Sequence, residues 1–276
     1  MSDPDALLEL AIEAARLGGG LLVERAAGGA ESSVASKSTP TDLVSEADVA
    51  SQRAIRALLR ERRPGDGFLG EEEGESETGT SGLRWIVDPL DGTVNFLFGI
   101  PQWSVSVAVA DEKGTVAGAV YDPNREELFA ATRGGPALLH GPGGERSALS
   151  GRSVDPHGAG AGEGSAEGLQ TAMVATGLAY DAEVRGRQAE VMAALIPRVR
   201  DIRRFGSAAL DLCWTAAGRF DAYYERSVKT WDVAAGELVC RSAGLEIREL
   251  PETDGLPWGI LAGRPGLAAA LQDIVG

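Results

Sequence analysis

The chain has 276 residues, 43% hydrophobic and 24% charged, which is enough apolar material for one large or two small globular domains and is not the composition of a disordered chain. Its 26 Lys and Arg against 41 Asp and Glu give a formal net charge of −15, which argues against a general nucleic-acid binder and a basic membrane-surface protein. Two Cys and two His exclude a disulfide scaffold and a histidine-rich metal site.

Two helices are predicted in the first part of the chain, at residues 3–25 and 45–63. In the first, Leu and Ala recur at helical spacing until a pair of glycines ends the run. The second opens on a capping-box pattern, in which Ser45 is followed three residues later by Asp48. The polar stretch 31–42 between them predicts a loop or hairpin. The N-terminus has no basic segment and no apolar run approaches a membrane span, so we expect a soluble, cytoplasmic protein without a signal peptide.

Residues 67–132 carry the pattern of β-strands. Short apolar or alternating runs are separated by turn residues, which predicts an antiparallel meander. The predicted strands are 68–69, 85–87, 105–109, 115–121 and 128–130.

The second half of the chain begins after a glycine-rich stretch. Residues 133–168 contain eleven Gly and three Pro and no helical periodicity, so we predict an exposed loop around a domain boundary there. Beyond it, strands alternate with helices, which indicates an α/β layer. The predicted strands are 172–175, a short one near Ile202, 222–224, 245–247 and 260–261, and the predicted helices are 184–196, 207–217 and 232–243. We expect an N-terminal α+β domain (1–145) and a C-terminal α/β domain (146–276), which together form a layered sandwich.

The segment that carries most chemical information is WIVDPLDGTVNF, residues 85–96. An apolar strand ends in Asp88, Pro89 forces a turn, and Asp91 follows, so the two carboxylates should converge on one point. Hard oxygen ligands of this kind suit Mg²⁺ better than Zn²⁺. The amides of Gly92 and Thr93, at the start of a short helix, would face an anion such as phosphate. The structural alternative makes Asp91 a helix N-cap and Asp88 a turn former.

Three further acidic residues lie, like Asp88 and Asp91, at the end of a predicted strand or at the start of a predicted helix. Glu71, in the acidic run after the strand at 68–69, is a third candidate ligand or part of a solvated loop. Asp232 stands at a predicted helix start and is either a cap or a ligand supplied by the second half of the chain. Asp48 is a capping residue or a carboxylate that orients a water molecule. The alternatives stay open for each of them.

The charges suggest why such acids would gather. Four carboxylates, those of Glu71, Asp88, Asp91 and Asp232, repel one another and an anionic substrate, whereas two Mg²⁺ ions balance their four negative charges. Metal-assisted attack of water on a phosphomonoester is then the expected reaction, and it needs no Cys or His. Cys213 and Cys240 lie in apolar helical runs and are expected to be core thiols. His140 and His157 are assigned no role.

Taken together, the motifs resemble the inositol monophosphatase family over nearly the whole chain. They are G-E-E at 70–72, D-P-L-D-G-T-x-N-F at 88–96 and W-D-x-A-A-G at 231–236, in the order and spacing of that family. The resemblance implies the αβαβα sandwich shared with fructose-1,6-bisphosphatase, Mg²⁺ dependence, Li⁺ sensitivity and a homodimer. The longer glycine-rich segment at 141–168 departs from many relatives.

The resemblance also implies roles for individual residues. Glu71, Asp88 and the Leu90 carbonyl would hold a first Mg²⁺, Asp88, Asp91 and Asp232 a second, and Glu71 with its neighbours a weaker third. Thr93, helped by Asp48, would activate the attacking water, with Glu71 as a further catalytic residue. The substrate would be bound by Leu90, Asp91, Gly92, Thr93, Arg203, Gly206, Ser207, Ala208, Glu225 and Asp232. Lys37 would act behind these residues.

The implied activity is hydrolysis of myo-inositol 1-phosphate. An alternative is the same chemistry on histidinol phosphate, fructose 1,6-bisphosphate, NADP or 3′-phosphoadenosine compounds. An alternative of another class is an interaction protein that binds a transcription- or ribosome-related partner, although the intact acidic motifs argue against a pure scaffold. A small phosphorylated substrate is therefore expected, with no membrane partner and no direct nucleic-acid contact.

Overall fold

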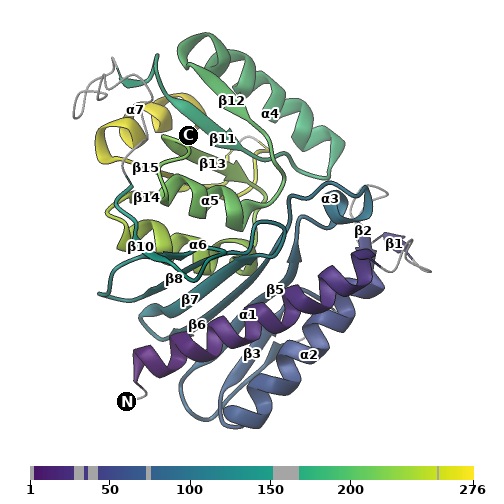
Figure 1. Ribbon diagram of the computed structural model, residues 1–276. Coiled ribbons are helices and arrows are strands. Elements are labelled where there is room, and N and C mark those ends of the chain that lie inside the picture. The colour runs from purple at the N-terminus through teal and green to yellow at the C-terminus, as the bar shows by residue number, and fades with distance from the viewer. Residues whose placement is uncertain (1–2, 28–33, 37–42, 73–75, 152–167, 254) are drawn as a thin grey trace.

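The computed structural model describes the chain apart from residues 1–2, 28–33, 37–42, 73–75, 152–167 and 254. Its elements stack in five layers, in the order helices, sheet, helices, sheet, helices (Figure 1). Each sheet therefore has helices on both faces, which buries the apolar side chains that its strands direct to either side. The layered αβαβα architecture expected from the sequence is confirmed.

The first outer layer consists of α1 (Pro4–Ala27) and α2 (Glu46–Arg62), which pack against each other and against the large sheet. Ser45 is the N-cap of α2, and its backbone N–H and hydroxyl both donate to the Asp48 carboxylate, so the predicted capping box is present. Between the two helices, β1 (Val34–Ser36) pairs antiparallel with β2 (Leu43–Ser45).

The large sheet has eight strands in the order β10-β9-β8-β7-β6-β5-β3-β4. All neighbours are antiparallel except β3 and β5, which run parallel. Along β6, residues that point to opposite faces pack into different hydrophobic cores. Val105 and Val107 pack toward α1 and α2, and Ala108 packs toward the helices between the two sheets. The strands are β3 (Gly67–Gly70), β4 (Ser76–Glu77), β5 (Arg84–Asp91), β6 (Ser104–Asp111), β7 (Gly114–Asp122), β8 (Glu127–Thr132), β9 (Leu138–His140) and β10 (Arg146–Ala148).

The middle layer is formed by α5 (Ala208–Ala216) and α6 (Thr230–Ser242), which lie between the two sheets (Figure 1). Cys213 and Cys240 are fully buried there, as expected for core thiols. The second sheet has five strands in the order β12-β11-β13-β15-β14. They are β11 (Met173–Thr176), β12 (Asp201–Arg203), β13 (Ala222–Arg226), β14 (Glu246–Leu250) and β15 (Gly259–Gly263).

The last layer covers the outer face of the second sheet with α4 (Ala182–Leu195) and α7 (Pro265–Val275). A 3₁₀ turn, η3 (Ile196–Arg198), follows α4, and the short α3 (Thr93–Leu97) follows β5. Among the described residues, no helix is long and apolar enough to cross a membrane.

Four expectations from the sequence need correction. The meander predicted for 67–132 is antiparallel only from β5 onward, because β3 and β5 run parallel. The stretch 133–168 is not a loop throughout, because β9 and β10 form a hairpin that extends the large sheet. His140 accordingly lies buried in β9, while His157 falls outside the described residues. The strand before Asp88 does not end there but continues to Asp91. The helix α7 was not predicted. The division at 145/146 stays a prediction, and β10 just beyond it pairs within the large sheet.

Candidate active site

A β-bulge on β5 brings the two aspartates of the central motif to one side. Asp88 pairs with Ser106 and Asp91 with Ser104 on β6, so three steps along β5 match two along its partner. In a regular strand, residues three apart point to opposite faces, and the extra residue at the bulge cancels that alternation. Both carboxylates line the same pocket as a result.

The N-terminus of α5 holds Asp91 in place. One carboxylate oxygen accepts from the Ser207 hydroxyl at 2.6 Å and from the Ala209 amide at 2.8 Å, and the other accepts from the Ala208 amide at 3.3 Å. The N-cap of α3 is Gly92, at φ 97°, a left-handed conformation that glycine adopts without strain. The reading of Asp91 as the cap of the helix that follows it is therefore wrong. Instead, Asp91 joins the two halves of the chain.

Glu71 and Asp232 approach from other elements. Glu71 follows β3, where the Gln52 side chain fixes the backbone by accepting from the Glu72 amide at 2.9 Å and donating to the Glu72 carbonyl at 2.8 Å. Asp232 lies in the first turn of α6 and accepts from the Lys229 amide at 2.6 Å, so the predicted capping role is present. In Asp88, one carboxylate oxygen accepts from the Leu90 amide at 3.0 Å.

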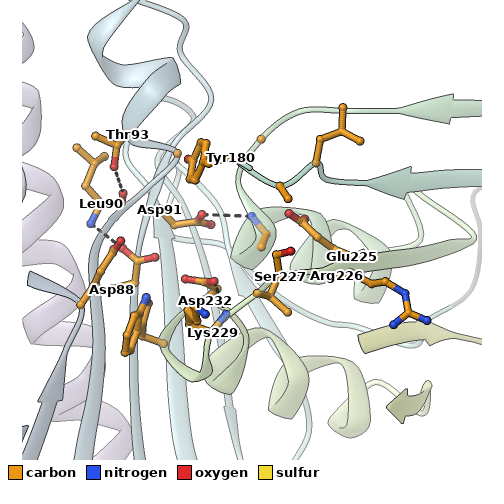
Figure 2. A pocket seen from close by; sticks show the side chains of 18 of the residues that line it. Asp88, Leu90, Asp91, Thr93, Tyr180, Glu225, Arg226, Ser227, Lys229 and Asp232 are labelled. Atoms are coloured by element: carbon orange, nitrogen blue, oxygen red, sulfur yellow. Dashed lines mark hydrogen bonds between the residues drawn. The ribbon is translucent and has the colours of Figure 1, made fainter. Parts of the chain in front are cut away.

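The electrostatics of these acids suit a cation. Burial raises the pKa of Asp88 well above its usual 3.8, and the carboxylates of Glu71 and Asp91 raise it further. Burial and the same two carboxylates raise the pKa of Asp232. The pKa of Asp91 rises to about 6 through burial, an effect that the hydrogen bond from Ser207 partly offsets. Figure 2 shows Asp88, Asp91 and Asp232 directed toward one space.

Whether these residues fit a divalent metal ion depends on donor chemistry and on arrangement. Carboxylate and carbonyl oxygens are the ligands that Mg²⁺ prefers. The candidate ligands Glu71, Asp88, Asp91 and Asp232 line one pocket. In the described part of the chain, no group of three or more His, Cys, Asp or Glu side chains stands in an arrangement that could hold a metal ion. The donor chemistry fits Mg²⁺, whereas the side chains as they stand in the described residues do not form a metal site. Neighbouring amides and a hydroxyl hold the carboxylates of Asp88, Asp91 and Asp232.

Thr93 and Asp48 form a second feature at the edge of this cluster. The Thr93 hydroxyl lies 2.9 Å from an Asp48 carboxylate oxygen and 3.1 Å from the Leu90 carbonyl, both of which can accept its proton. Asp48 is fully buried at the start of α2, and burial raises its pKa despite the hydrogen bonds from Ser45. A buried carboxylate of raised proton affinity thus stands directly behind a hydroxyl that lines the pocket.

Glu225 marks the opposite wall of the pocket. It comes from β13, and one carboxylate oxygen accepts from the Tyr223 hydroxyl at 2.9 Å. Burial raises its pKa from 4.5 to about 7. Its carboxylate lies against Gly177, where an added Cβ would stand only 1.9 Å from Glu225 atoms, so any other residue at 177 would displace Glu225.

All of these groups surround one cavity of about 250 Å³ between the two sheets (Figure 2). Asp48 and Ser207 stand behind it, in contact with Thr93 and Asp91. Arg203 pairs with Asp201 and is not among the lining residues, so its predicted substrate contact stays a prediction. Lys37 lies outside the described residues. The predicted residues that do line the cavity are Glu71, Asp88, Leu90, Asp91, Gly92, Thr93, Gly206, Ala208, Glu225 and Asp232.

Two stretches of the pocket wall were not predicted from the sequence, and at a third place the neighbouring residue was predicted instead. Residues 178–180, after β11, line the cavity, yet no charged or motif residue marks them in the sequence. Arg204 lines it where Arg203 was predicted, and the Arg-Arg pair gave no basis for choosing between them. Residues 226–229 complete the wall between Glu225 and Asp232.

Known proteins resemble this chain in sequence and in fold. The model of the inositol monophosphatase family matches residues 3–275. Inositol-1-monophosphatase SuhB of Mycobacterium tuberculosis is 41% identical over 255 residues, 89% of this chain and 83% of that protein. Nus factor SuhB of Pasteurella multocida is 38% identical over 239 residues, 86% of this chain and 83% of that protein. The crystal structure of the extragenic suppressor protein suhB from Bartonella henselae has a TM-score of 0.83 and 33% identity and covers 98% of both chains.

Together with the layered α/β fold, these similarities show that the protein is a phosphatase. The chain belongs to the inositol monophosphatase family. Members of this family generally use divalent metal ions.

Proposed function

We propose that this protein is a Mg²⁺-dependent phosphomonoesterase that hydrolyses myo-inositol 1-phosphate. One observation carries the proposal: carboxylates from four separate segments line the same cavity as a Thr93 hydroxyl that is hydrogen-bonded to the buried Asp48. Such a cavity repels a phosphate ester unless cations neutralise it, and the name of the M. tuberculosis relative supports the inositol substrate.

For the metal ions, we assign the carboxylates of the cavity. Glu71, Asp88 and the Leu90 carbonyl would hold the first Mg²⁺, Asp88, Asp91 and Asp232 the second, and Glu71 a weaker third. When bound, these ions would neutralise the phosphate and lower the pKa of the nucleophilic water. We extend the proposal to Li⁺ sensitivity, which a Li⁺ titration at fixed Mg²⁺ tests.

The chain's own groups have two tasks in the reaction. Thr93 would orient the attacking water through its hydroxyl oxygen, while its proton points to Asp48, whose raised pKa makes it a better proton acceptor. Glu71 would act as a further catalytic residue beside them. The amides of Gly92 and Thr93 would bind the phosphate.

The other side of the cavity would hold the alcohol. Glu225 would accept hydrogen bonds from the hydroxyls of inositol, and Gly206 and Ala208 would shape the wall beside it. Ser207 would keep Asp91 in place, as its 2.6 Å hydrogen bond supports. A contact with Arg203 requires its guanidinium to leave Asp201, and Arg204 is the better-placed arginine.

The test is a panel of phosphomonoesters assayed with and without Mg²⁺. It contains myo-inositol 1-phosphate, histidinol phosphate, fructose 1,6-bisphosphate, NADP and 3′-phosphoadenosine compounds. We expect kcat/KM to be highest for the inositol ester, with activity lost on EDTA treatment and restored by Mg²⁺. Equal rates across the panel would refute the inositol assignment, and full activity in EDTA would refute the metal assignment.

A second candidate function is binding to a transcription complex. The similarity to the Pasteurella multocida protein named Nus factor SuhB is the observation that favours it. Pull-down with wild type and with the Asp88→Asn variant separates the two activities. A partner retained equally by both supports an interaction role that is independent of catalysis, and retention of no partner by either protein argues against it.

We further propose that the enzyme works in the cytoplasm as a homodimer. Exposed apolar side chains after α3 support a contact with a second copy, since Phe98 is 72% and Ile100 48% exposed. Light scattering of wild type and of Phe98→Asp tests it. A wild-type protein that is monomeric at micromolar concentration would refute the dimer.

A further inference from the structure

One residue of the cavity wall has an unfavourable backbone conformation. Ser227, directly after β13, has φ 72°, in the left-handed region. Only one other non-glycine residue of the described chain, Glu126, has positive φ, and it lies in the tight turn between β7 and β8. Strained non-glycine residues persist where the surrounding structure enforces them, often at ligand sites. The Ser227 amide donates to the Trp258 carbonyl at 2.9 Å, which fixes this backbone.

The side chain of Ser227 is unusual as well. Its hydroxyl oxygen is buried, and in the described part of the chain it has no hydrogen-bond partner. Buried hydroxyls are nearly always hydrogen-bonded, because leaving one unpaired forfeits its interaction with water. The residue lines the cavity between Glu225 and Asp232 (Figure 2). Neither the fold nor a neighbouring side chain thus accounts for a serine at this position.

We infer that the Ser227 side chain, which lines the cavity, turns about its Cα–Cβ bond to bring its buried hydroxyl into the cavity, where it binds a hydroxyl group of the substrate's alcohol part and so determines specificity for polyol phosphates. A serine hydroxyl can donate and accept at once, as can the hydroxyls of a polyol. Glu225, two residues away on the same wall, supplies only acceptors when ionised. The pair therefore recognises an alcohol that presents adjacent hydroxyls, and a substrate without hydroxyls leaves Ser227 unpaired. This inference rests on the proposed function, because it names the part of the substrate that is recognised.

Glycine would serve better at position 227 if only the backbone mattered. It adopts positive φ without strain, so a purely structural role predicts that Ser227→Gly stabilises the protein and changes nothing else. The inference predicts that the same variant loses specificity. Ser227→Ala removes the hydroxyl but keeps the strain, so the two variants separate the hydroxyl from the backbone.

The experiment compares both variants with wild type on myo-inositol 1-phosphate and on phenyl phosphate, which carries no hydroxyl on its leaving group. The readout is the ratio of kcat/KM for the two esters, together with Tm. We expect this ratio to fall about 3- to 10-fold in both variants, through KM for the inositol ester, as loss of one neutral hydrogen bond implies. Ser227→Gly should melt about 2 to 4 °C above Ser227→Ala. Ser147→Ala, on exposed β10, is the matched control and should keep the wild-type ratio.

The outcomes distinguish this inference from the proposed function. If wild type hydrolyses the inositol ester and both variants keep its ratio, Ser227 has no role in specificity and the inference fails alone. An equal rise in KM for both esters also overturns it, because a distorted wall then explains the loss. If wild type hydrolyses phenyl phosphate but no polyol phosphate, the proposed function fails and the inference fails with it.

Discussion

Replacing Glu225 by Gln should stabilise the metal-free protein while weakening its activity. Gln keeps an oxygen that accepts from the Tyr223 hydroxyl and removes the charge that burial opposes. The pKa of Glu225 rises from 4.5 to about 7 in the fold, so the folded state binds a proton that the unfolded state has released between these pH values. Stability must therefore fall as the pH rises through this window. A rise of about 2.5 corresponds to about 3 kcal/mol, which partial exposure to solvent reduces to about 1 to 3 kcal/mol.

Urea unfolding of the two proteins in EDTA, from pH 4 to pH 8, measures this effect. The difference in unfolding free energy between Glu225→Gln and wild type should be close to zero at pH 4 and reach its full size at pH 8. Glu249→Gln, an exposed change on β14 of the same sheet, is the control and should show no such trend. A difference that stays constant from pH 4 to pH 8 would refute the electrostatic reasoning.

Three other changes have defined expectations. Asp88→Asn should lower kcat by about 10³-fold or more, because one carboxylate would serve two ions. Asp111→Asn, at the far end of β6 and outside the cavity lining, should keep the wild-type kcat, and similar kcat values for the two variants would contradict the assignment. Thr93→Val keeps the side-chain shape and should lower kcat by about 10²- to 10⁴-fold with the Mg²⁺ requirement unchanged, so a loss confined to KM argues against a role in activating water. Arg226→Met removes a buried guanidinium that donates to the carbonyls of Pro251, Pro257 and Val275. It should lower the free energy of unfolding, measured in urea, by about 2 to 4 kcal/mol. An unchanged urea midpoint would show that these hydrogen bonds add no net stability.

Most of the fold could be predicted because its elements have strong local signals. The helix α2 begins at Glu46, directly after its N-cap Ser45, as the capping box predicts, and β6 follows from alternating Val and small residues. The hairpin of β9 and β10 was missed because its strands are three residues each within a glycine-rich stretch. Short strands of this kind are stabilised by pairing with an existing sheet edge, which no local pattern reveals.

The acids of the site were predictable as residue types, but their arrangement was not. Asp88 and Asp91 reach one cavity through a bulge, and the sequence suggested a turn at Pro89 instead. The contact of Asp91 with the start of α5 links residues more than a hundred positions apart, and no spacing rule predicts it. Ser227 carried no signal, since a positive φ on a serine is set by the surrounding structure.

The position of α5 and α6 between the two sheets has a consequence for how the molecule opens. Both helices pack against the two sheets, although Glu237 and Arg241 of α6 reach solvent, so fraying of an edge strand or an outer helix leaves their buried sides covered. Amide protons on the buried sides of these two helices should therefore exchange with solvent only when the whole molecule unfolds. The first turn of each carries a contact to the cavity, through Ala208 and Ala209 in α5 and Asp232 in α6. The acidic centre is thus attached to the slowest-opening part of the protein, and local breathing elsewhere leaves it assembled.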